Sequence, residues 1–372
     1  MRIAHISDCY LPRTGGIEAQ VRGLAVRQAH AGDDVSVITA TPGHGAAIEL
    51  LEGVQVTRVT MRLPGDLPLH PRTAHHVEQV LERWRPDVVH VHVGVVSPFA
   101  WGALRAIRRQ ALPTVVTVHG VWGPLARPAV RVLEPAVGWS SQHLLLTAVS
   151  SVAASAVARS LGRPVGVLAN GIDPAAWRGQ APAAASAVEP ATLRLVSVMR
   201  LAPRKRVGAL LRIVAEASEV LAGRVDVRLT VVGDGPERAR AERRARARGV
   251  RATFTGRLPR AGILAAFAES DVFVQPSVRE SFGIAALEAR TFGLPVVARS
   301  QAGTRDFIED GVNGLLAADD AAMAQAVVTL ALDQGLRERI RRENADQPPA
   351  QTWDAVLSEA ADFYRRVRSS SA

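Results

Sequence analysis

The sequence predicts an α/β fold in which two doubly wound domains follow each other along the chain, and three observations predict it. The chain has 372 residues, and at about 150 residues per domain this length predicts two domains. Short β-rich segments alternate with helical patterns, which is typical of parallel sheets covered by helices. Residues 87–93 form a nearly unbroken apolar run, as expected for a central parallel strand buried on both faces.

The first domain is predicted to span residues 1–178. A strand over residues 2–7 leads through a glycine-containing loop into a helix over 18–31, and a helix over 73–84 is ended by Pro86. The other predicted elements continue the alternation. The strands cover 35–39, 54–60, 87–93, 113–119, 144–149 and 165–168. One helix covers 98–110, and another follows the strand 144–149 and ends at residue 161.

Residues 179–192 have no periodicity and are predicted to be a linker. The second domain is expected to span residues 193–350. Its predicted strands cover 193–198, 227–232, 252–255, 272–275, 295–298 and 314–316, and its helices 207–221, 236–248, 260–270, 282–291 and a segment after 319. Such Rossmann-like units bind ligands at the carboxyl ends of their strands, so a central cleft that both domains face is the expected site.

The composition excludes several classes of protein. Hydrophobic residues make up 48% and charged residues 22% of the chain, as in soluble globular proteins. The single cysteine, Cys9, excludes a disulfide scaffold and a cysteine-based zinc site. Asp8 lies too early for a signal peptide, and no run of about 18 apolar residues exists. We therefore expect a cytoplasmic protein.

The net charge of +10 favours nucleic acid, an anionic membrane face or phosphorylated ligands as partners. Lys205 is the only lysine among 45 basic residues. It lies in the loop 199–206 with Arg200, Arg204 and Arg206, directly after a predicted strand. A compact ammonium differs from a guanidinium in the contacts it makes, so this loop is a candidate phosphate site. The alternative is a solvated basic loop.

Glycines follow the first predicted strand at Gly15 and Gly16. They let the backbone approach a ligand, and the next helix offers free N–H groups to an anion. A tight turn between strand and helix explains the glycine pair equally well. His119 ends a buried strand just before Gly120, where a histidine is often structural, but its place beside the other loops favours function.

A helix start is predicted after the strand 272–275. Ser281 is the expected N-cap, and the first free N–H groups of this helix would belong to Phe282, Gly283 and Ile284.

Two glutamates flank this helix start. Glu280 lies just before it, and Glu288 lies roughly 9 Å further along the axis. This separation suits a sugar and a ribose joined by a diphosphate, because carboxylates accept paired hydrogen bonds from vicinal hydroxyls. The alternative is one carboxylate favoured by the helix dipole and one surface glutamate.

His90 and His92 lie on one face of the strand 87–93, as a metal-binding pair would. No acidic or cysteine partner has metal-site spacing nearby, so packing and hydrogen bonding are the favoured interpretation.

Taken together, these residues resemble the retaining, nucleotide-sugar-dependent glycosyltransferases of family 4, which have the GT-B architecture of two Rossmann-like domains. The resemblance covers nearly the whole chain. It is carried by Gly15-Gly16-Ile17-Glu18, Asp87-Val88-Val89-His90-Val91-His92, His119-Gly120, Asn170-Gly171-Ile172-Asp173, Arg200 with Lys205, Gly233-Asp234-Gly235-Pro236, Phe254-Thr255-Gly256-Arg257-Leu258, Glu280 with Glu288, and Asp310-Gly311-Val312-Asn313-Gly314-Leu315. One departure is Gln301-Ala302-Gly303-Thr304-Arg305-Asp306, which replaces the usual Gly-Gly-x-x-Glu.

The resemblance implies a role for each residue. It implies that Arg200, Lys205 and the Gly16 backbone, next to Gly15, bind the donor diphosphate. It implies that Glu280 holds donor-sugar hydroxyls and that Glu288 binds the ribose. The remaining implied contacts are with the sugar for Phe282, Gly283 and Ile284, with the base for Arg257 and Leu258, and with the transferred sugar or the acceptor for His119.

The resemblance also implies that residues 353–372 return to the first domain. No cofactor or metal is expected, because the chain lacks the Asp-x-Asp clamp of many diphosphate-sugar enzymes and two cationic side chains can stabilise the leaving group instead. Magnesium would at most stimulate the reaction. GDP-mannose and UDP-sugars both remain possible donors, and the acceptor is a small molecule or a lipid-linked one, with weak peripheral contact to the inner membrane face.

Two alternative functions remain at this point. One is a nucleotide-sugar epimerase of the same fold. The other is a protein that binds nucleic acid or an anionic surface through residues 237–250, which carry six arginines. That segment has no aromatic residue for base stacking and includes two glutamates, so we interpret it as a solvated helix and expect no nucleic-acid partner.

Overall fold

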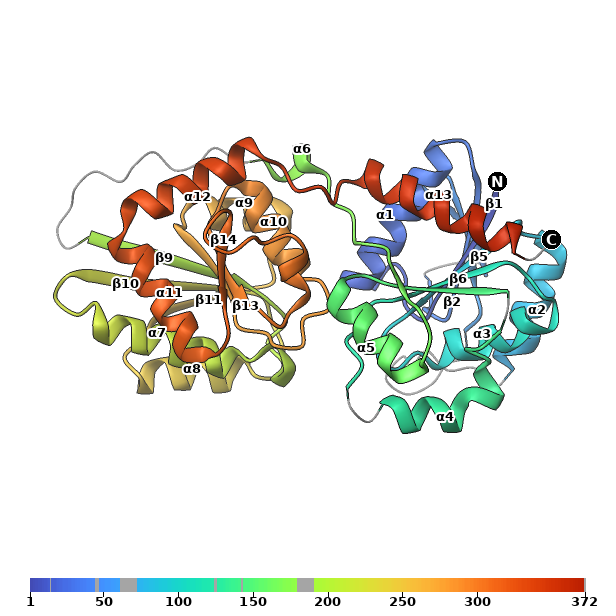
Figure 1. Cartoon of the computed structure of the whole chain (residues 1–372), viewed down its shortest axis with the longest axis horizontal. Coiled ribbons are helices and arrows are strands. Elements are labelled where there is room, and N and C mark those ends of the chain that lie inside the picture. The colour runs from blue at the N-terminus through green and yellow to red at the C-terminus, as the bar shows by residue number, and fades with distance from the viewer. Residues whose placement is uncertain are drawn as a thin grey trace. The chain divides into compact units, whose positions relative to one another are not determined.

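The computed structural model describes residues 1–370 except 14, 44–46, 61–71, 124–125, 142 and 179–190. The chain forms two compact units (Figure 1): Met1–Gly171 together with Trp353–Ala372, and Ile172–Thr352. Most of the predicted linker lies outside the described residues, and its last two residues already belong to a strand. Residues 172–178, which the sequence pattern assigns to the first domain, are part of the second unit.

The sheet of unit 1 has eight strands in the order β3-β4-β2-β1-β5-β6-β7-β8. Every neighbouring pair is parallel except β3 and β4. The strands are β1 (Arg2–Ser7), β2 (Asp34–Thr39), β3 (Ile48–Leu51), β4 (Val54–Arg58), β5 (Val88–Val93), β6 (Thr114–Val118), β7 (Leu144–Ala148) and β8 (Gly166–Val167). All six residues of β5 are buried, as a central parallel strand requires.

The helices of unit 1 are α1 (Gly16–His30), α2 (Thr73–Trp84), α3 (Pro98–Arg109), α4 (Ala126–Val137), α5 (Ser151–Leu161) and α13 (Trp353–Ser369). The C-terminal helix α13 lies beside α1 (Figure 1). It buries Phe363 and Tyr364 in a cluster with Ile3 and Val88 from the sheet. Trp353 fits where Gly23 and Gly171 have no side chain, since a Cβ at either position would come within 2.5 Å of its ring.

The sheet of unit 2 has six parallel strands in the order β11-β10-β9-β12-β13-β14. They are β9 (Ala191–Val198), β10 (Val225–Val232), β11 (Arg251–Gly256), β12 (Val272–Gln275), β13 (Val296–Arg299) and β14 (Gly314–Ala317). The helices are α6 (Pro174–Trp177), α7 (Val207–Val220), α8 (Arg238–Ala247), α9 (Arg260–Ala268), α10 (Ile284–Phe292), α11 (Asp320–Leu332) and α12 (Gln334–Asp346), with short 3₁₀ turns at Pro203–Lys205 and Gly303–Asp306.

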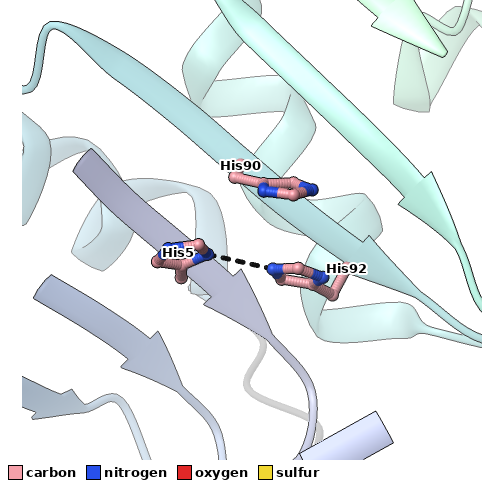
Figure 2. Close-up of side chains that lie close together, drawn as sticks. All are labelled: His5, His90 and His92. Atoms are coloured by element: carbon pink, nitrogen blue, oxygen red, sulfur yellow. Dashed lines mark hydrogen bonds between the residues drawn. The ribbon is translucent and has the colours of Figure 1, made fainter. Parts of the chain in front are cut away.

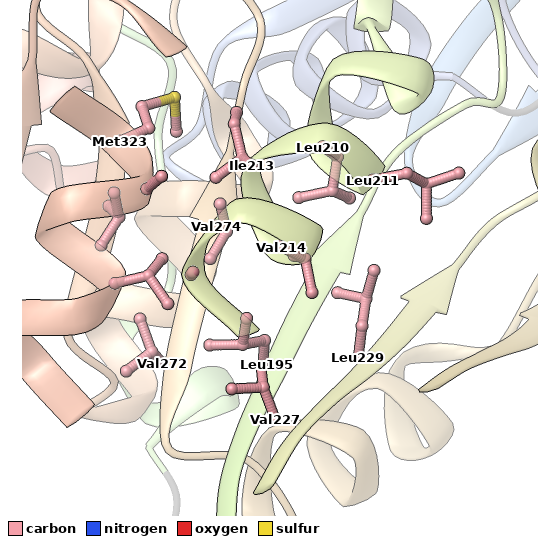
Figure 3. Close-up of a cluster of buried hydrophobic side chains, with 14 of the residues drawn as sticks. Leu195, Leu210, Leu211, Ile213, Val214, Val227, Leu229, Val272, Val274 and Met323 are labelled. Atoms are coloured by element: carbon pink, nitrogen blue, oxygen red, sulfur yellow. The ribbon is translucent and has the colours of Figure 1, made fainter. Parts of the chain in front are cut away.

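A core cluster of unit 2 packs α7, α8, α11 and α12 against the sheet, and Figure 3 shows the part around α7. Leu210, Ile213 and Val214 of α7 pack over Leu195 and Leu229, and all five side chains are essentially inaccessible to solvent. The spacing of the buried residues along α7 follows the helical period, which is why the sequence pattern predicts this helix.

Each sheet has a topological switch point that places the candidate site residues. In unit 1 the chain passes from β1 to β2 on one side and continues with β5 on the other; in unit 2, β10 and β12 flank β9 in the same way. The loops that leave such strands diverge to opposite faces and open a crevice at the carboxyl edge. Within the described ranges, no helix has the length and apolarity needed to cross a bilayer.

Candidate active site

The loops after β9 and β12 lie against each other at the switch point of unit 2. Lys205 Nζ donates to Glu280 Oε2 at 2.6 Å. The Ser277 hydroxyl donates to the Lys205 carbonyl oxygen at 3.3 Å, and the Arg206 guanidinium donates to the Pro276 carbonyl oxygen at 2.9 Å. The structure therefore brings together the two charged residues, Lys205 and Glu280, that the sequence singled out from different loops.

The cations of the basic loop do not all face solvent. Arg206 forms a two-pronged ion pair with Asp320 at 2.8 and 2.9 Å. Burial would raise the pKa of Asp320, but its ion pairs with Arg206, Arg299 and Arg212 lower it overall. The exposed side chains of Arg200 and Arg204 have no ion-pair partner in the described part of the chain. Arg206 thus anchors the loop, while Arg200 is left available.

The predicted helix start after β12 is wrong by two residues. Helix α10 begins at Ile284, and its N-cap is Gly283 in the left-handed region at φ 99°, not Ser281. A Cβ at Gly283 would come within 2.5 Å of Thr304 Cγ2, so glycine is required both by conformation and by space. Phe282 turns into the interior against the Phe307 ring, 5.3 Å between centroids, and only its backbone can face a ligand.

The loop that departs from the family pattern packs under this helix start. The Gly303 amide donates to the Glu280 carbonyl oxygen at 2.8 Å. A Cβ at Gly303 would come within 2.2 Å of the Ser281 carbonyl oxygen. The glycine of the departing segment therefore still supports the backbone that carries Glu280.

Glu288 is the fifth residue of α10 and lies about 7.5 Å along the axis from Gly283. Its side chain is partly buried, and its carboxylate has no hydrogen-bond or ion-pair partner among the residues that the structure describes. Burial raises its pKa to about 8. A carboxyl group that is desolvated without a partner is poised to accept hydrogen bonds from a ligand.

Arg257 and Leu258 directly follow β11, the outer strand of the same sheet edge. The amide of Gly233, after β10, donates to the Gly256 carbonyl oxygen at 2.8 Å. This contact keeps the ends of the two strands together. Arg257 is exposed and Leu258 is partly buried. They follow β11, which is separated by β10 from β9, the strand that precedes the Lys205 loop.

In unit 1, Gly15 is the N-cap of α1 and Gly16 its first residue. The Gly15 backbone is extended, so its conformation does not require glycine. A Cβ there would come within 2.5 Å of Glu18 Oε2, but this atom ends a flexible side chain that can move aside. Glu18 pairs with Arg13 at 3.5 Å, and Gly15 and Gly16 are both exposed at this helix start.

His119 follows β6 and ends a line of histidines on neighbouring strands. His119 Nε2 lies 3.1 Å from His92 Nδ1, and His92 Nε2 lies 3.0 Å from His5 Nδ1. Figure 2 shows His5 of β1 and His92 of β5 facing each other. Burial lowers the pKa of His119 to about 4, so its ring is neutral at pH 7.

His5 lies next to the pair His90 and His92, and the sequence pattern did not predict this. It is opposite His90 in the sheet register. Candidate ligand atoms of these three buried histidines lie within 4.8 Å of one another. All six ring nitrogens nevertheless have hydrogen-bond partners, from Gln28, Thr117, Tyr364 and the other histidines. The arrangement is therefore a hydrogen-bonded network. Only the strand order, not the residue spacing, could have revealed His5.

Comparison with known proteins identifies the family of the chain. Residues 14–176 match the model of Glycosyltransferase Family 4, and residues 192–333 match that of Glycosyl transferases group 1. A GDP-mannose-dependent alpha-mannosyltransferase of Mycolicibacterium smegmatis is 30% identical over 99% of this chain and 98% of its own. The chain belongs to glycosyltransferase family 4. A phosphatidyl-myo-inositol mannosyltransferase of Mycobacterium leprae is also 30% identical, over 100% of this chain and 98% of its own.

Solved structures confirm the expected GT-B fold of this family 4 member. HepE from Anabaena, in complex with UDP, superposes with a TM-score of 0.75 at 19% identity and covers 98% of this chain and 100% of its own. A sucrose-phosphate synthase from Thermosynechococcus elongatus gives 0.76 at 18% identity, with 99% of each chain covered. The family 4 fold thus extends over both units.

Proposed function

We propose that this glycosyltransferase moves a hexose from a nucleotide diphosphate sugar to a hydroxyl acceptor with retention of anomeric configuration. The bond between the anomeric carbon and the phosphate oxygen breaks, a bond to the acceptor oxygen forms, and the nucleoside diphosphate leaves. The observation that carries the proposal is the Lys205–Glu280 ion pair at the switch point of unit 2, with the unpartnered Glu288 one to two helical turns away.

In this proposal the ion pair is exchanged for ligand contacts. The Lys205 ammonium and the exposed Arg200 guanidinium stabilise the two negative charges that grow on the leaving diphosphate. Glu280, released from Lys205, accepts hydrogen bonds from hydroxyls of the transferred sugar beside the backbone of Phe282, Gly283 and Ile284. The pair keeps both charged groups in position before the donor arrives, which limits reorganisation during the reaction.

The remaining contacts complete the donor site. We assign the ribose hydroxyls to Glu288, whose oxygens have no competing partner, and the base to Arg257 and Leu258. We assign a diphosphate contact to the Gly16 backbone and the transferred sugar or the acceptor to His119.

GDP-mannose is the preferred donor in this proposal, because the relatives that match both units at 30% identity are named for mannosyl transfer. A UDP-sugar is the second candidate, supported by the UDP complex of HepE. An inositol-containing lipid would be a fitting acceptor, since one relative is named for it. The net charge of +10 would then support weak contact with an anionic cytoplasmic membrane face.

Thermal-shift measurements with GDP, UDP and their sugars test the donor assignment directly. We expect stabilisation by a nucleoside diphosphate and, with a suitable acceptor, a product of the same anomeric configuration as the donor. Release of free nucleotide with an epimerised sugar and no glycosylated acceptor would support the epimerase alternative. Recovery of the protein in the supernatant with anionic vesicles at low salt would argue against a membrane-bound acceptor.

A further inference from the structure

Donors and acceptors can be assigned along a chain of buried polar side chains that ends at His119. The Thr147 hydroxyl donates to the Val116 carbonyl oxygen at 3.3 Å. With the Val116 carbonyl as the acceptor of the single Thr147 proton, we assign the 2.7 Å contact between the two threonine hydroxyls to donation by Thr117. Thr117 can then only accept from His90 Nε2, at 2.7 Å. His90 therefore carries a proton on Nε2.

The other nitrogen of His90 determines the next two groups. Burial holds the pKa of His90 well below its usual value, so the ring is neutral and Nδ1 is unprotonated. Tyr364 must donate its hydroxyl proton to this Nδ1, at 2.8 Å. Gln28 Nε2 in turn donates to the Tyr364 oxygen at 3.1 Å. The amide of Gln28 is thereby oriented with its oxygen toward His5.

The oriented amide sets the protonation of the remaining histidines. Gln28 Oε1 can only accept, so His5 donates from Nε2 at 2.7 Å. Burial keeps His5 and His92 neutral by lowering their pKa values. His5 Nδ1 therefore accepts from His92 Nε2, and the dashed line in Figure 2 joins these two rings. His92 Nδ1 accepts from His119 Nε2. His119 Nδ1 keeps its lone pair and has no partner within the described ranges.

We propose that Gln28, His5 and His92 are positioning residues that hold His119 in its neutral Nε2–H tautomer, so that Nδ1 accepts a hydrogen bond from a substrate hydroxyl. The tautomer follows from the hydrogen bonds and from the neutrality of the buried rings, and only the hydroxyl partner rests on the proposed function. Every proton in the chain points the same way. Reversing it would require Thr147 to give up the Val116 carbonyl and would turn Nδ1 of His119 into a donor.

Nitrogen-15 NMR of the full-length protein with labelled histidines tests the tautomer without any substrate. We expect His5, His90, His92 and His119 to be neutral with the proton on Nε2 between about pH 6 and 8. A proton on Nδ1 of His119, or a charged His119 ring in this range, would overturn the proposal. Cobalt(II) binding would also overturn it. A ligand-field spectrum that appears on addition of cobalt(II) and is lost in His5→Ala would show that the nitrogens of His5, His90 and His92 bind metal instead of each other.

Gln28→Met breaks the chain between Tyr364 and His5, and Thr147→Val breaks it at its origin. We expect both variants to give a mixture of His119 tautomers, and kcat to fall roughly five- to tenfold with little change in donor KM, as for one weakened hydrogen bond in the transition state. The matched control is Gln20→Met, also on α1, which loses two hydrogen bonds to Gly171 and should leave the tautomer unchanged.

An unchanged His119 tautomer in both Gln28→Met and Thr147→Val would overturn the proposal. If Gln28→Met does not fold, Thr147→Val alone decides the test. A protein that shows the expected tautomers but transfers no sugar would refute the proposed function while leaving the tautomer assignment intact. The two failures are therefore distinguishable.

Discussion

The carboxyl edges of the two sheets share a topology but differ in how their polar groups are held. In unit 1 the strands β1 and β5 and the loop after β6 carry neutral histidines whose pKa values burial lowers. In unit 2 the loops after β9 and β12 present a lysine and a glutamate that are paired at 2.6 Å. Burial thus leaves neutral hydrogen-bonding groups at one edge and a compensated pair of charges at the other.

In the proposed function this difference matches two needs of a diphosphate-sugar donor. In the proposed function the diphosphate needs positive charge, and the ion pair with Glu280 holds the Lys205 side chain in place before the donor binds. A sugar hydroxyl needs an oriented acceptor, which a neutral imidazole of fixed tautomer supplies. The same type of sheet edge can therefore carry charged groups in one unit and oriented neutral hydrogen-bond acceptors in the other.

Replacing Glu280 should have the largest effect on turnover. Glu280→Ala removes the proposed contact with the transferred sugar, so we expect kcat to fall by about 10²–10³ while bare GDP binds with little change. Initial rates and calorimetry measure both quantities. Glu269→Ala removes an exposed glutamate of the same unit and is the control. A loss of GDP affinity as large as the loss of turnover would move Glu280 away from the sugar.

Glu288 should make nucleotide binding depend on pH. In the protein without ligand, burial raises the pKa of Glu288 to about 8, so this carboxyl group is mostly protonated at pH 7. Ribose hydroxyls that donate to the carboxylate favour its ionised form, so its pKa falls on binding and a proton is released. Affinity should therefore rise with pH up to about 8, by at most roughly tenfold per pH unit, and level off above it.

Calorimetry at pH 7 in buffers of different ionisation enthalpy measures that proton. Glu288→Gln should abolish both the proton release and the pH dependence. Binding of GDP to the unaltered protein with no buffer-dependent heat would rule out a ribose contact by an ionised Glu288.

The two glycines that flank α10 separate backbone strain from crowding at the unit 2 edge. Gly293 has φ 106°, and a Cβ there would meet no atom closer than 4.0 Å, whereas Gly283 has φ 99° and its Cβ would crowd Thr304. Gly293→Ala should cost about 1 kcal/mol of unfolding free energy. Gly283→Ala should cost more and should also weaken binding of the nucleotide sugar, as urea unfolding and calorimetry would show. Equal costs and unchanged binding would mean that the loop tolerates the displacement.

Chelation should have the smallest effect. Because Lys205 and Arg200 are proposed to stabilise the leaving group, activity in EDTA should stay within about twofold of that with magnesium. Complete and reversible loss of activity in EDTA would show that a metal ion, not the cationic loop, balances the diphosphate.

Much of this comparison could be predicted from the sequence, because buried parallel strands and their following loops have strong local patterns. The strand over residues 2–7 and the helix over residues 73–84 agree with the structure to the residue. Helix α12 was missed, since it buries only Ile340, Arg341 and Asn344 and has little apolar periodicity.

What could not be predicted depends on contacts between distant segments. The true start of α10 follows from the left-handed Gly283 packing on Thr304, which no local capping pattern reveals. The role of His5 depends on β1 lying beside β5, 85 residues later in the register, and on α13 bringing Tyr364 to His90. The pairing of Lys205 with Glu280 likewise depends on contact between two loops whose residues are 75 positions apart in the sequence.

The most direct test of the charged edge is a cycle that removes one charge from the protein and the diphosphate from the ligand. GDP and guanosine, with UDP and uridine in parallel, are titrated by calorimetry into the unaltered protein, Lys205→Ala and the neighbouring control Arg204→Ala. Loss of a charge-assisted contact predicts that Lys205→Ala binds the diphosphate about ten- to a hundredfold more weakly, with nucleoside binding and the Arg204→Ala control nearly unchanged. Equal weakening of nucleotide and nucleoside, or unchanged affinity for both, would contradict a diphosphate site at Lys205.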